Sequence, residues 1–192
     1  MVSNAESGSG GLAGTRSSFV QRVIGAAMLN AATYEEVEAD RSAVAQAAAV
    51  VLLSSLAAGF GARGFGASRP VDIALYAGIS LVAWMMWAVL TYRIGASLLP
   101  ESQTRADVGE LLRTLGFASA PGLLRILGIA PGLTNVVFAV SAVWMLAAMI
   151  VAVRQALDYT GTGRAIAVCM LAWVLALIVA VALGIFFGPH VS

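Results

Sequence analysis

Residues Val136–Val153 read VVFAVSAVWMLAAMIVAV, a stretch of 18 positions without a charged side chain. At the 1.5 Å rise of an α-helix, about 20 apolar residues cross the roughly 30 Å hydrocarbon core of a bilayer. Apolar side chains fill every face of this stretch, whereas a water-facing helix would carry them on one face only. We therefore predict that it forms a transmembrane helix.

Three further apolar stretches have the length of a span: Ala43–Phe60, Ile73–Leu90 and Ile166–Phe187. Trp84 and Trp87 fall in the middle of the second stretch, where we expect them to fill space between helices rather than to anchor it at the surface. The composition agrees with a membrane protein. Of all residues, 60% are hydrophobic and only 11% are charged, against about 25% charged residues in a soluble domain.

The segment Leu111–Ala130 is apolar enough to enter the membrane but contains Pro121, which kinks or breaks a helix. In lipid, a broken helix must be shielded by other spans or be re-entrant. Arg113 and Arg125 stand near its ends, where long side chains reach the membrane surface. The predicted fold is an all-α, polytopic membrane helix bundle of five spans over residues 43–188, one of them broken at the proline. The count falls to four spans if this segment only dips into the membrane.

Two regions precede the bundle. Residues 1–18 are rich in Ser, Gly and Ala, lack the apolar core of a secretory signal, and are expected to be a disordered tail. Residues 19–42 are expected to hold a short interfacial amphipathic helix at Phe19–Leu29, with Ser17 or Ser18 as its N-cap. This helix either lies on the membrane surface or packs on the spans. Residues 189–192 form a short tail at the other end.

The second half of the 19–42 region is acidic. Thr33 and Glu36 have the spacing of a capping box, which predicts a helix start. Four acids lie within six residues, namely Glu35, Glu36, Glu38 and Asp40. They are explained by a solvated helix start, whose positive end favours acids. The alternative is that they form a docking patch for a basic partner or a divalent cation.

The arginines set the predicted orientation. With five spans and a cytoplasmic N-terminus, eight of the eleven arginines lie on the cytoplasmic side, and Arg63 and Arg69 lie outside. The positive-inside rule favours this arrangement, which places the C-terminus outside. With four spans, Arg154 and Arg164 would also be outside. We therefore predict an integral protein of a bacterial inner membrane.

Several residues are predicted to bind partners or lipid. Small residues recur every four positions in the last span, at Ala172, Ala176, Ala180 and Gly184. Such a stripe lets two helix backbones approach closely, either within the protein or between subunits. Four arginines near the cytoplasmic surface are expected to contact lipid headgroups: Arg22, Arg113, Arg154 and Arg164.

Two smaller features concern the loop before the last span. Arg154 and Asp158 are four residues apart and have the spacing of an ion pair on one helix face. Thr162 is expected to be the N-cap of the last span, which would then begin near Gly163.

The rare residue types exclude several chemistries. The chain has one cysteine, Cys169, one histidine, His190, and no lysine. An intramolecular disulfide, a thiolate metal cluster, bis-histidine haem ligation and a lysine Schiff base are therefore excluded. No nucleophile–base pair is visible, so we expect neither an enzyme nor a cofactor. A net charge of +1 without a basic stripe argues against nucleic acid as a partner.

The stretch LRTLGFASAP at Leu112–Pro121 resembles the Leu-Gly-(aromatic)-Ala-x-x-Pro segment of the Yip-domain family. Four other parts of the chain add to the resemblance by their order and spacing: Tyr34–Asp40, Trp144, Val153–Asp158 and Thr162–Ala165. The resemblance covers roughly residues 19–187 and implies the five-span fold of bacterial members. Eukaryotic members are implicated in vesicle traffic and bind small prenylated GTPases. This chain departs from them in its short N-terminal tail, and the family supplies no catalytic residues.

Three functions are compatible with these features. A non-catalytic scaffold or accessory subunit of a larger membrane complex fits best, because the spans hold almost no ionisable groups while small-residue faces are plentiful. Its partners would be lipids and either other membrane subunits or further copies of the chain. A small-solute transporter or channel is the second alternative, since discontinuous helices such as the one at Pro121 build transport sites. Lipid binding or membrane remodelling through the amphipathic helix is the third.

Overall fold

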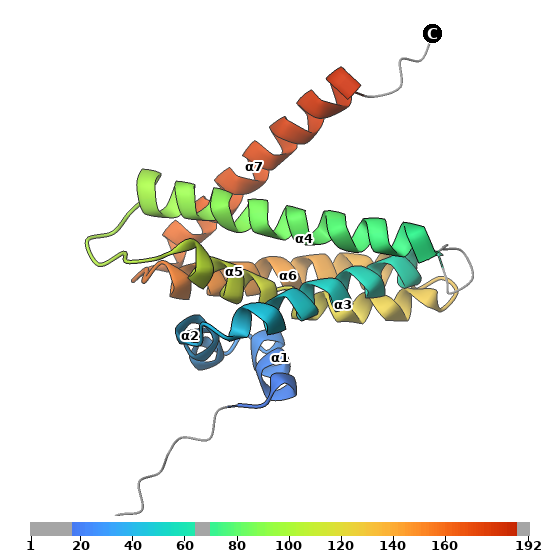
Figure 1. Cartoon of the computed structure of the whole chain (residues 1–192), viewed down its shortest axis with the longest axis horizontal. Helices are drawn as coiled ribbons and strands as arrows, with labels where there is room; N and C mark the ends of the chain where they lie inside the picture. Colours follow the sequence, from blue (N-terminus) through green and yellow to red (C-terminus); the bar gives the residue numbers. More distant parts are fainter. Residues whose placement is uncertain (1–16, 64–69, 188–192) are drawn as a thin grey trace, which may run out of the picture.

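A computed structural model describes residues 17–63 and 70–187, apart from some side chains near helix ends, and every regular element in this part of the chain is helical (Figure 1). The all-α prediction is confirmed. In chain order the helices are α1 (Phe19–Ala27), α2 (Ala31–Ala39), α3 (Ala43–Arg63), α4 (Pro70–Tyr92), the π-helix η1 (Arg93–Leu98), α5 (Val108–Phe117), the 3₁₀ helix η2 (Ala120–Ile129), α6 (Thr134–Ala156) and α7 (Thr162–Phe187). The tails predicted at 1–18 and 189–192 lie outside the described residues, except for Ser17 and Ser18.

The long helices form a bundle, with α3, α4 and α6 side by side (Figure 1). Three helical segments are long and apolar enough to cross a membrane: Ala43–Ala62, Ala77–Leu98 and Thr134–Ala156. An integral membrane protein is therefore consistent with the structure. In α7 the described apolar part, Thr162–Ile178, is shorter, and α5 and η2 are each too short to cross alone. Five spans therefore remain a prediction.

The α5–η2 segment packs lengthwise against α3 through small residues. Three pairs mark the contact: Gly116 with Ala47, Gly122 with Ser54, and Gly128 with Gly61. The partners recur every seven residues on α3 and every six on the α5–η2 side. Seven residues make nearly two turns of an α-helix, and six make two turns of a 3₁₀ helix, so the two stripes stay in register. The small residues let the two backbones approach closely along the whole contact.

The α5–η2 segment is interrupted just before its proline. Helix α5 ends at Phe117, and Pro121 stands in the first turn of η2, where a missing N–H removes no helix hydrogen bond. At the junction, Ser119 Oγ donates to the carbonyl oxygen of Gly116 at 2.6 Å. The N–H of Gly122 donates to the carbonyl oxygen of Ser119 at 2.9 Å. These bonds satisfy backbone groups that a break in the helix would leave unpaired.

The two N-terminal helices begin at different kinds of cap. Ser18 and Gln21 form a capping box at the start of α1, which confirms the predicted N-cap. The capping box predicted at Thr33 and Glu36 is wrong. The side chain of Asn30 accepts from the N–H of Ala32 at 3.0 Å, so α2 begins almost a turn earlier and Thr33 lies inside it.

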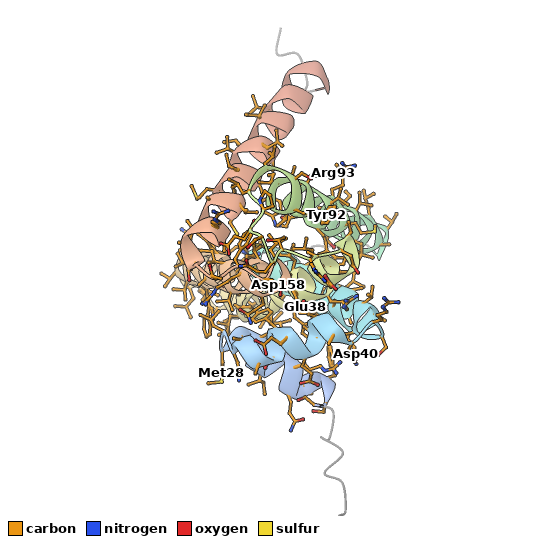
Figure 2. All side chains as sticks on the ribbon, turned by 90° about the vertical axis from the view of Figure 1, so that its left-hand side faces the viewer. Met28, Glu38, Asp40, Tyr92, Arg93 and Asp158 are labelled. Atoms are coloured by element: carbon orange, nitrogen blue, oxygen red, sulfur yellow. The ribbon has the colours of Figure 1, made fainter. Side chains whose placement is uncertain are left out.

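Helix α1 packs against the flank of the bundle. The ring of Phe19 lies 6.4 Å from that of Phe117, and the indole N–H of Trp144 donates to the carbonyl oxygen of Ala27 at 2.6 Å. Trp144 is the eleventh residue of the 23-residue α6, so the end of α1 lies near the middle of that helix. The outer edge of α1 exposes an apolar stripe formed by Val20, Ile24 and Met28. Met28 lies at the edge of the molecule in Figure 2. Helix α1 therefore packs on the bundle, while its apolar stripe stays exposed.

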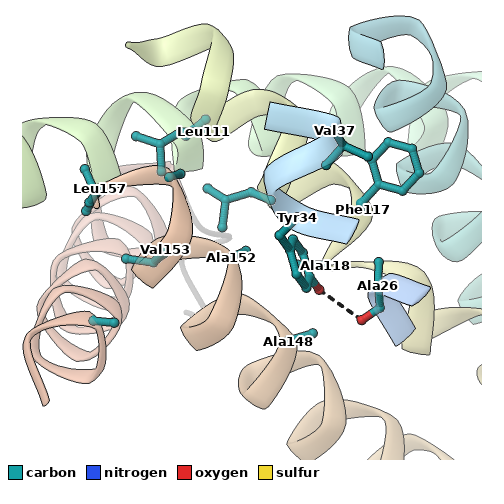
Figure 3. Close-up of a cluster of buried hydrophobic side chains, with 14 of the residues drawn as sticks. Ala26, Tyr34, Val37, Leu111, Phe117, Ala118, Ala148, Ala152, Val153 and Leu157 are labelled. Atoms are coloured by element: carbon teal, nitrogen blue, oxygen red, sulfur yellow. Dashed lines mark hydrogen bonds between the residues drawn. The ribbon is translucent and has the colours of Figure 1, made fainter. Parts of the chain in front are cut away.

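The core lies where α2, α5 and α6 meet (Figure 3). Tyr34 is fully buried there, and its hydroxyl donates to the carbonyl oxygen of Ala26 at 3.0 Å. This bond holds α2 on the end of α1. Leu111 and Phe117 belong to the same buried cluster as Tyr34. Because the phenol is desolvated, the pKa of Tyr34 is raised well above its usual value.

The mid-helix tryptophans fill space between helices, as predicted. The indole N–H of Trp84 on α4 donates to the carbonyl oxygen of Leu112 at 3.1 Å. The ring of Trp87 meets that of Trp173 on α7 edge-on, with centroids 6.0 Å apart. Both side chains are partly buried against the core.

The predicted ion pair after α6 is wrong. Helix α6 ends at Ala156, and Asp158 has a φ of +52°, so Asp158 lies beyond the helix and off its face. Arg154 instead donates to the carbonyl oxygens of Tyr159 and Thr160 at 3.4 and 3.5 Å. Helix α7 begins at Thr162 itself, one residue earlier than predicted.

Candidate functional site

The acidic segment is paired within the chain. Arg22 on α1 is only 2% exposed, and its Nε and Nη2 donate to Glu36 Oε1 at 3.1 and 3.0 Å. Its Nη2 also donates to Asp40 Oδ2 at 2.9 Å, and its Nη1 donates to Gln46 Oε1 on α3 at 3.1 Å. The expectation that Arg22 contacts lipid headgroups is therefore wrong. The docking patch loses two of its four acids, because Glu36 and Asp40 already neutralise this buried guanidinium.

These contacts lower the pKa of both paired carboxyl groups, as expected beside a cation. Burial would raise the pKa of Glu36, but hydrogen bonds from Ser17 and Arg22 outweigh it and hold the pKa below its usual range. Hydrogen bonds from Ser42 and Arg22 lower the pKa of Asp40 to about 2. Both carboxylates are therefore charged at neutral pH, as an ion pair with Arg22 requires.

Arg113 is also buried, at 5% exposure. Its Nε donates to the carbonyl oxygens of Val37 and Glu38 at 3.1 and 2.9 Å, and its Nη2 donates to the same oxygen of Glu38. These carbonyls belong to the last turn of α2, where a cation is favoured by the negative end of the helix. Arg113 caps α2 and does not face headgroups, so this second expectation is wrong as well.

The other two arginines are exposed. Arg164 Nε lies 3.2 Å from Glu101 Oε1, and Arg164 Nη1 donates to the carbonyl oxygen of Pro100 at 2.8 Å. Arg154 makes only the two long bonds already described. Contact of these two arginines with headgroups stays a prediction.

The remaining acids line a polar hollow of about 860 Å³, where Glu38 and Asp158 lie close to each other (Figure 2). Its lining includes Glu35, Glu38, Glu110, Asp158, Arg154 and Tyr159. Burial, together with the charges of Glu110 and Asp158, raises the pKa of Glu38 to about 7. Among the residues described, no three His, Cys, Asp or Glu side chains converge as a metal site would require.

The small-residue stripe of α7 is described only in part. Ala172 is fully buried against the bundle, and Ala176 is half-buried. At Ala172 the stripe therefore serves internal packing. The side chain of Ala180 and the surroundings of Gly184 lie outside the described residues.

A cavity of about 650 Å³ lies between α3, α4, α6 and the α5–η2 segment. Most of its lining is apolar, and it includes Val51, Leu56, Trp84, Trp87, Leu115 and Met149. The polar side chains on its walls are four serines and one arginine: Ser54, Ser55, Ser80, Ser119 and Arg125. On α3 the lining runs from Val51 to Ala62, which at 1.5 Å per residue is about 16 Å.

Among the described residues of this lining, Arg125 is the one that carries a charge. Its Nε is buried and has no hydrogen-bond partner, and no acid in the described part of the chain pairs with its guanidinium. The guanidinium carbon lies 5.5 Å from the ring centroid of Phe138, within the range of a cation–π contact. The backbone of Arg125 packs on Gly61, close to the end of α3. The sequence placed Arg125 near the end of a broken helix but did not predict that it lines a cavity.

Comparison with protein-family models, with characterised proteins and with solved structures found no match in any of the three. The resemblance to the Yip-domain family therefore stays a prediction, and functional inference rests on the geometry of the chain itself.

Proposed function

We propose that the protein is a non-catalytic integral membrane protein that binds an amphiphilic molecule of the membrane in the cavity beside Arg125. The observation that carries this proposal is a cavity of about 650 Å³ with largely apolar walls, lined by Arg125, whose buried Nε has no hydrogen-bond partner in the described part of the chain. Its volume falls in the range of about 300–1,000 Å³ that is usual for small-molecule sites. Ionisable residues inside membrane bundles are costly and commonly mark a functional site.

The proposal includes the five-span fold. The α5–η2 segment follows α3 from Ala47 to Gly61, and its two helices have lengths of about 15 and 20 Å. Together they match the roughly 30 Å of a bilayer core, which supports a span broken at Pro121. Helix α7, at 26 residues, is long enough to be the fifth span. The arginine distribution supports a cytoplasmic N-terminus in a bacterial inner membrane.

A glycine pair provides the test of cavity binding. Gly59 lines the cavity, and a Cβ added there would meet nothing within 4 Å. Gly59→Leu therefore adds a bulky side chain at the cavity wall without a clash at its Cβ. Gly78 on α4 is equally open but is not part of the lining, so Gly78→Leu is the matched control.

The experiment purifies the full chain from native membranes in a mild detergent and counts bound lipids by native mass spectrometry. We expect a retained lipid-like molecule in the wild type and in Gly78→Leu, and a loss of most of it in Gly59→Leu. Retention of the same molecules by all three proteins would show that the cavity is not their binding site and would contradict the proposal.

A second function, an accessory subunit of a membrane complex, is favoured by α7. This helix leaves the bundle at an angle (Figure 1), and apolar side chains are exposed around it, including Leu171, Val174, Leu177 and Ile178. A transmembrane helix of a partner protein would pack against these exposed side chains of α7. Gentle solubilisation should then recover a partner in fixed ratio, and alanine-to-leucine change at Ala176 should weaken its recovery. Recovery of the chain alone would exclude this function.

A further inference from the structure

We infer that the cavity accepts a single-chain amphiphile with an anionic headgroup, which Arg125 binds. The inference rests on the proposed function and adds the chemical class of the ligand. It follows from the charge of the cavity, its size, and the position of Arg125 along it.

The charge of the cavity is uncompensated. An arginine carries five N–H donors, and the buried Nε of Arg125 finds no acceptor among the described residues. Phe138 lies on one side of the guanidinium and offers only its ring face. A carboxylate or phosphate can accept two parallel N–H bonds from a guanidinium, which are among the stronger hydrogen bonds in proteins. A neutral hydroxyl can accept one such bond, but it carries no charge to offset that of the guanidinium, and bonds between two charged groups are stronger.

The size of the cavity favours one chain. A water molecule occupies about 30 Å³ of liquid, and a methylene group is of similar size. A cavity of 650 Å³ therefore has room for roughly 20 such groups. This suits one long acyl chain with its headgroup, whereas a two-chain phospholipid would not fit.

The position of Arg125 matches that of a headgroup. Its backbone packs on Gly61, two residues before the end of α3, where the helix approaches the membrane surface. From there the lining extends toward the middle of the bundle through Trp84 and Leu115, which are apolar. The charged group of the ligand would thus lie near the surface, and its chain would run inward between α3 and α4.

The first measurement compares two probes with the same chain. The purified full-length protein in a non-ionic detergent is titrated with oleate and with oleyl alcohol, and bound molecules are counted by native mass spectrometry. We expect oleate to bind about tenfold more tightly or better, the range for hydrogen bonds to a charged group. Equal binding of the two probes would overturn the inference and leave the proposed function intact. Failure of both to bind would overturn the proposed function as well.

Variants then assign the preference to Arg125. Arg125→Gln should bring the two probes to equal affinity, while Arg125→Lys should retain a weaker preference for oleate. Arg93→Gln removes an exposed arginine that does not line the cavity and should behave like the wild type. A preference for oleate that persists in a folded Arg125→Gln protein would overturn the assignment.

Competition with oleate distinguishes a two-chain lipid from a single-chain amphiphile as the ligand. Phosphatidylglycerol offers an anionic headgroup on two chains, and oleyl phosphate offers one on a single chain. We expect oleyl phosphate to compete with oleate and phosphatidylglycerol to compete poorly. Stronger competition by phosphatidylglycerol would overturn the single-chain assignment.

Discussion

Arg22 on α1 and Glu36 on α2 form a two-point contact, in which the Nε and Nη2 of one guanidinium both lie within 3.1 Å of Glu36 Oε1. The guanidinium is almost completely removed from solvent, and it also donates to Asp40 and Gln46. One side chain thereby joins α1, α2 and α3. The acidic segment consequently stabilises the fold at this corner of the bundle.

Replacement of Arg22 by alanine should destabilise the protein. Glu36 and Asp40 would keep their charges but lose the partner that compensates them, and we expect a loss of about 2–3 kcal/mol. Thermal unfolding of the purified protein in detergent measures it. Arg41→Ala is the matched control, because Arg41 lies close by in sequence but is exposed. Equal unfolding temperatures for the two variants would contradict the structural role of Arg22.

Stability should depend on pH through Glu38. Its pKa is raised to about 7 in the folded protein, so the folded state binds this proton more tightly than the unfolded state. Stability that is present below about pH 4.5 should be lost as the pH rises through 7, by about 2–3 kcal/mol. Glu38→Gln should remove this loss. Asp40, whose pKa is lowered to about 2, acts in the opposite direction and only below about pH 4.

Unfolding temperatures between pH 5 and 8 check the effect of Glu38. The wild type should become less stable toward pH 8, and Glu38→Gln should show a flatter profile. Glu110→Gln removes one of the charges that raise the pKa of Glu38, and it should give an intermediate profile. Identical profiles for the wild type and Glu38→Gln would rule out this dependence.

Gly61 should tolerate no side chain. A Cβ there would collide with the carbonyl oxygen of Arg125, which belongs to the backbone and cannot move aside alone. We expect Gly61→Ala to lower stability by about 1–3 kcal/mol. Gly59→Ala, two residues earlier and in open space, should instead raise it by about 0.5–1 kcal/mol. Chemical denaturation in detergent compares the pair, and equal stabilities would show that the contact between α3 and η2 is looser than described.

The long apolar helices were predictable because composition alone marks them. Val136–Val153 is enclosed by α6 with only a few residues added at each end. The contacts of the acidic segment were not predictable, since they depend on how the chain turns between α1 and α2. Leu29 adopts a φ of +60°, an unusual conformation for leucine, and the turn brings Glu36 back onto Arg22. No local pattern in the sequence signals that turn.

The cavity was missed for a different reason. Sequence patterns in helices are interpreted with a period of 3.6 residues, but η2 follows a period of 3.0 over ten residues. Such a change of period redirects side chains around the helix. Arg125 was expected only to reach a membrane surface near the end of this segment, and the 3₁₀ geometry of η2 also turns it onto the cavity wall. Runs of 3₁₀ helix longer than three or four residues are uncommon, so one was not expected here.

The hydrogen bond between Trp144 and Ala27 has a consequence for the order of assembly. It joins residues 117 positions apart, and the Phe19–Phe117 contact likewise reaches far along the chain. Helix α1 leaves the ribosome well before α6, yet the surface that receives it is complete only once α6 has been made. Helix α1 must therefore wait for α6 to reach its final place, and until then the side that carries Phe19 has only the membrane to cover it.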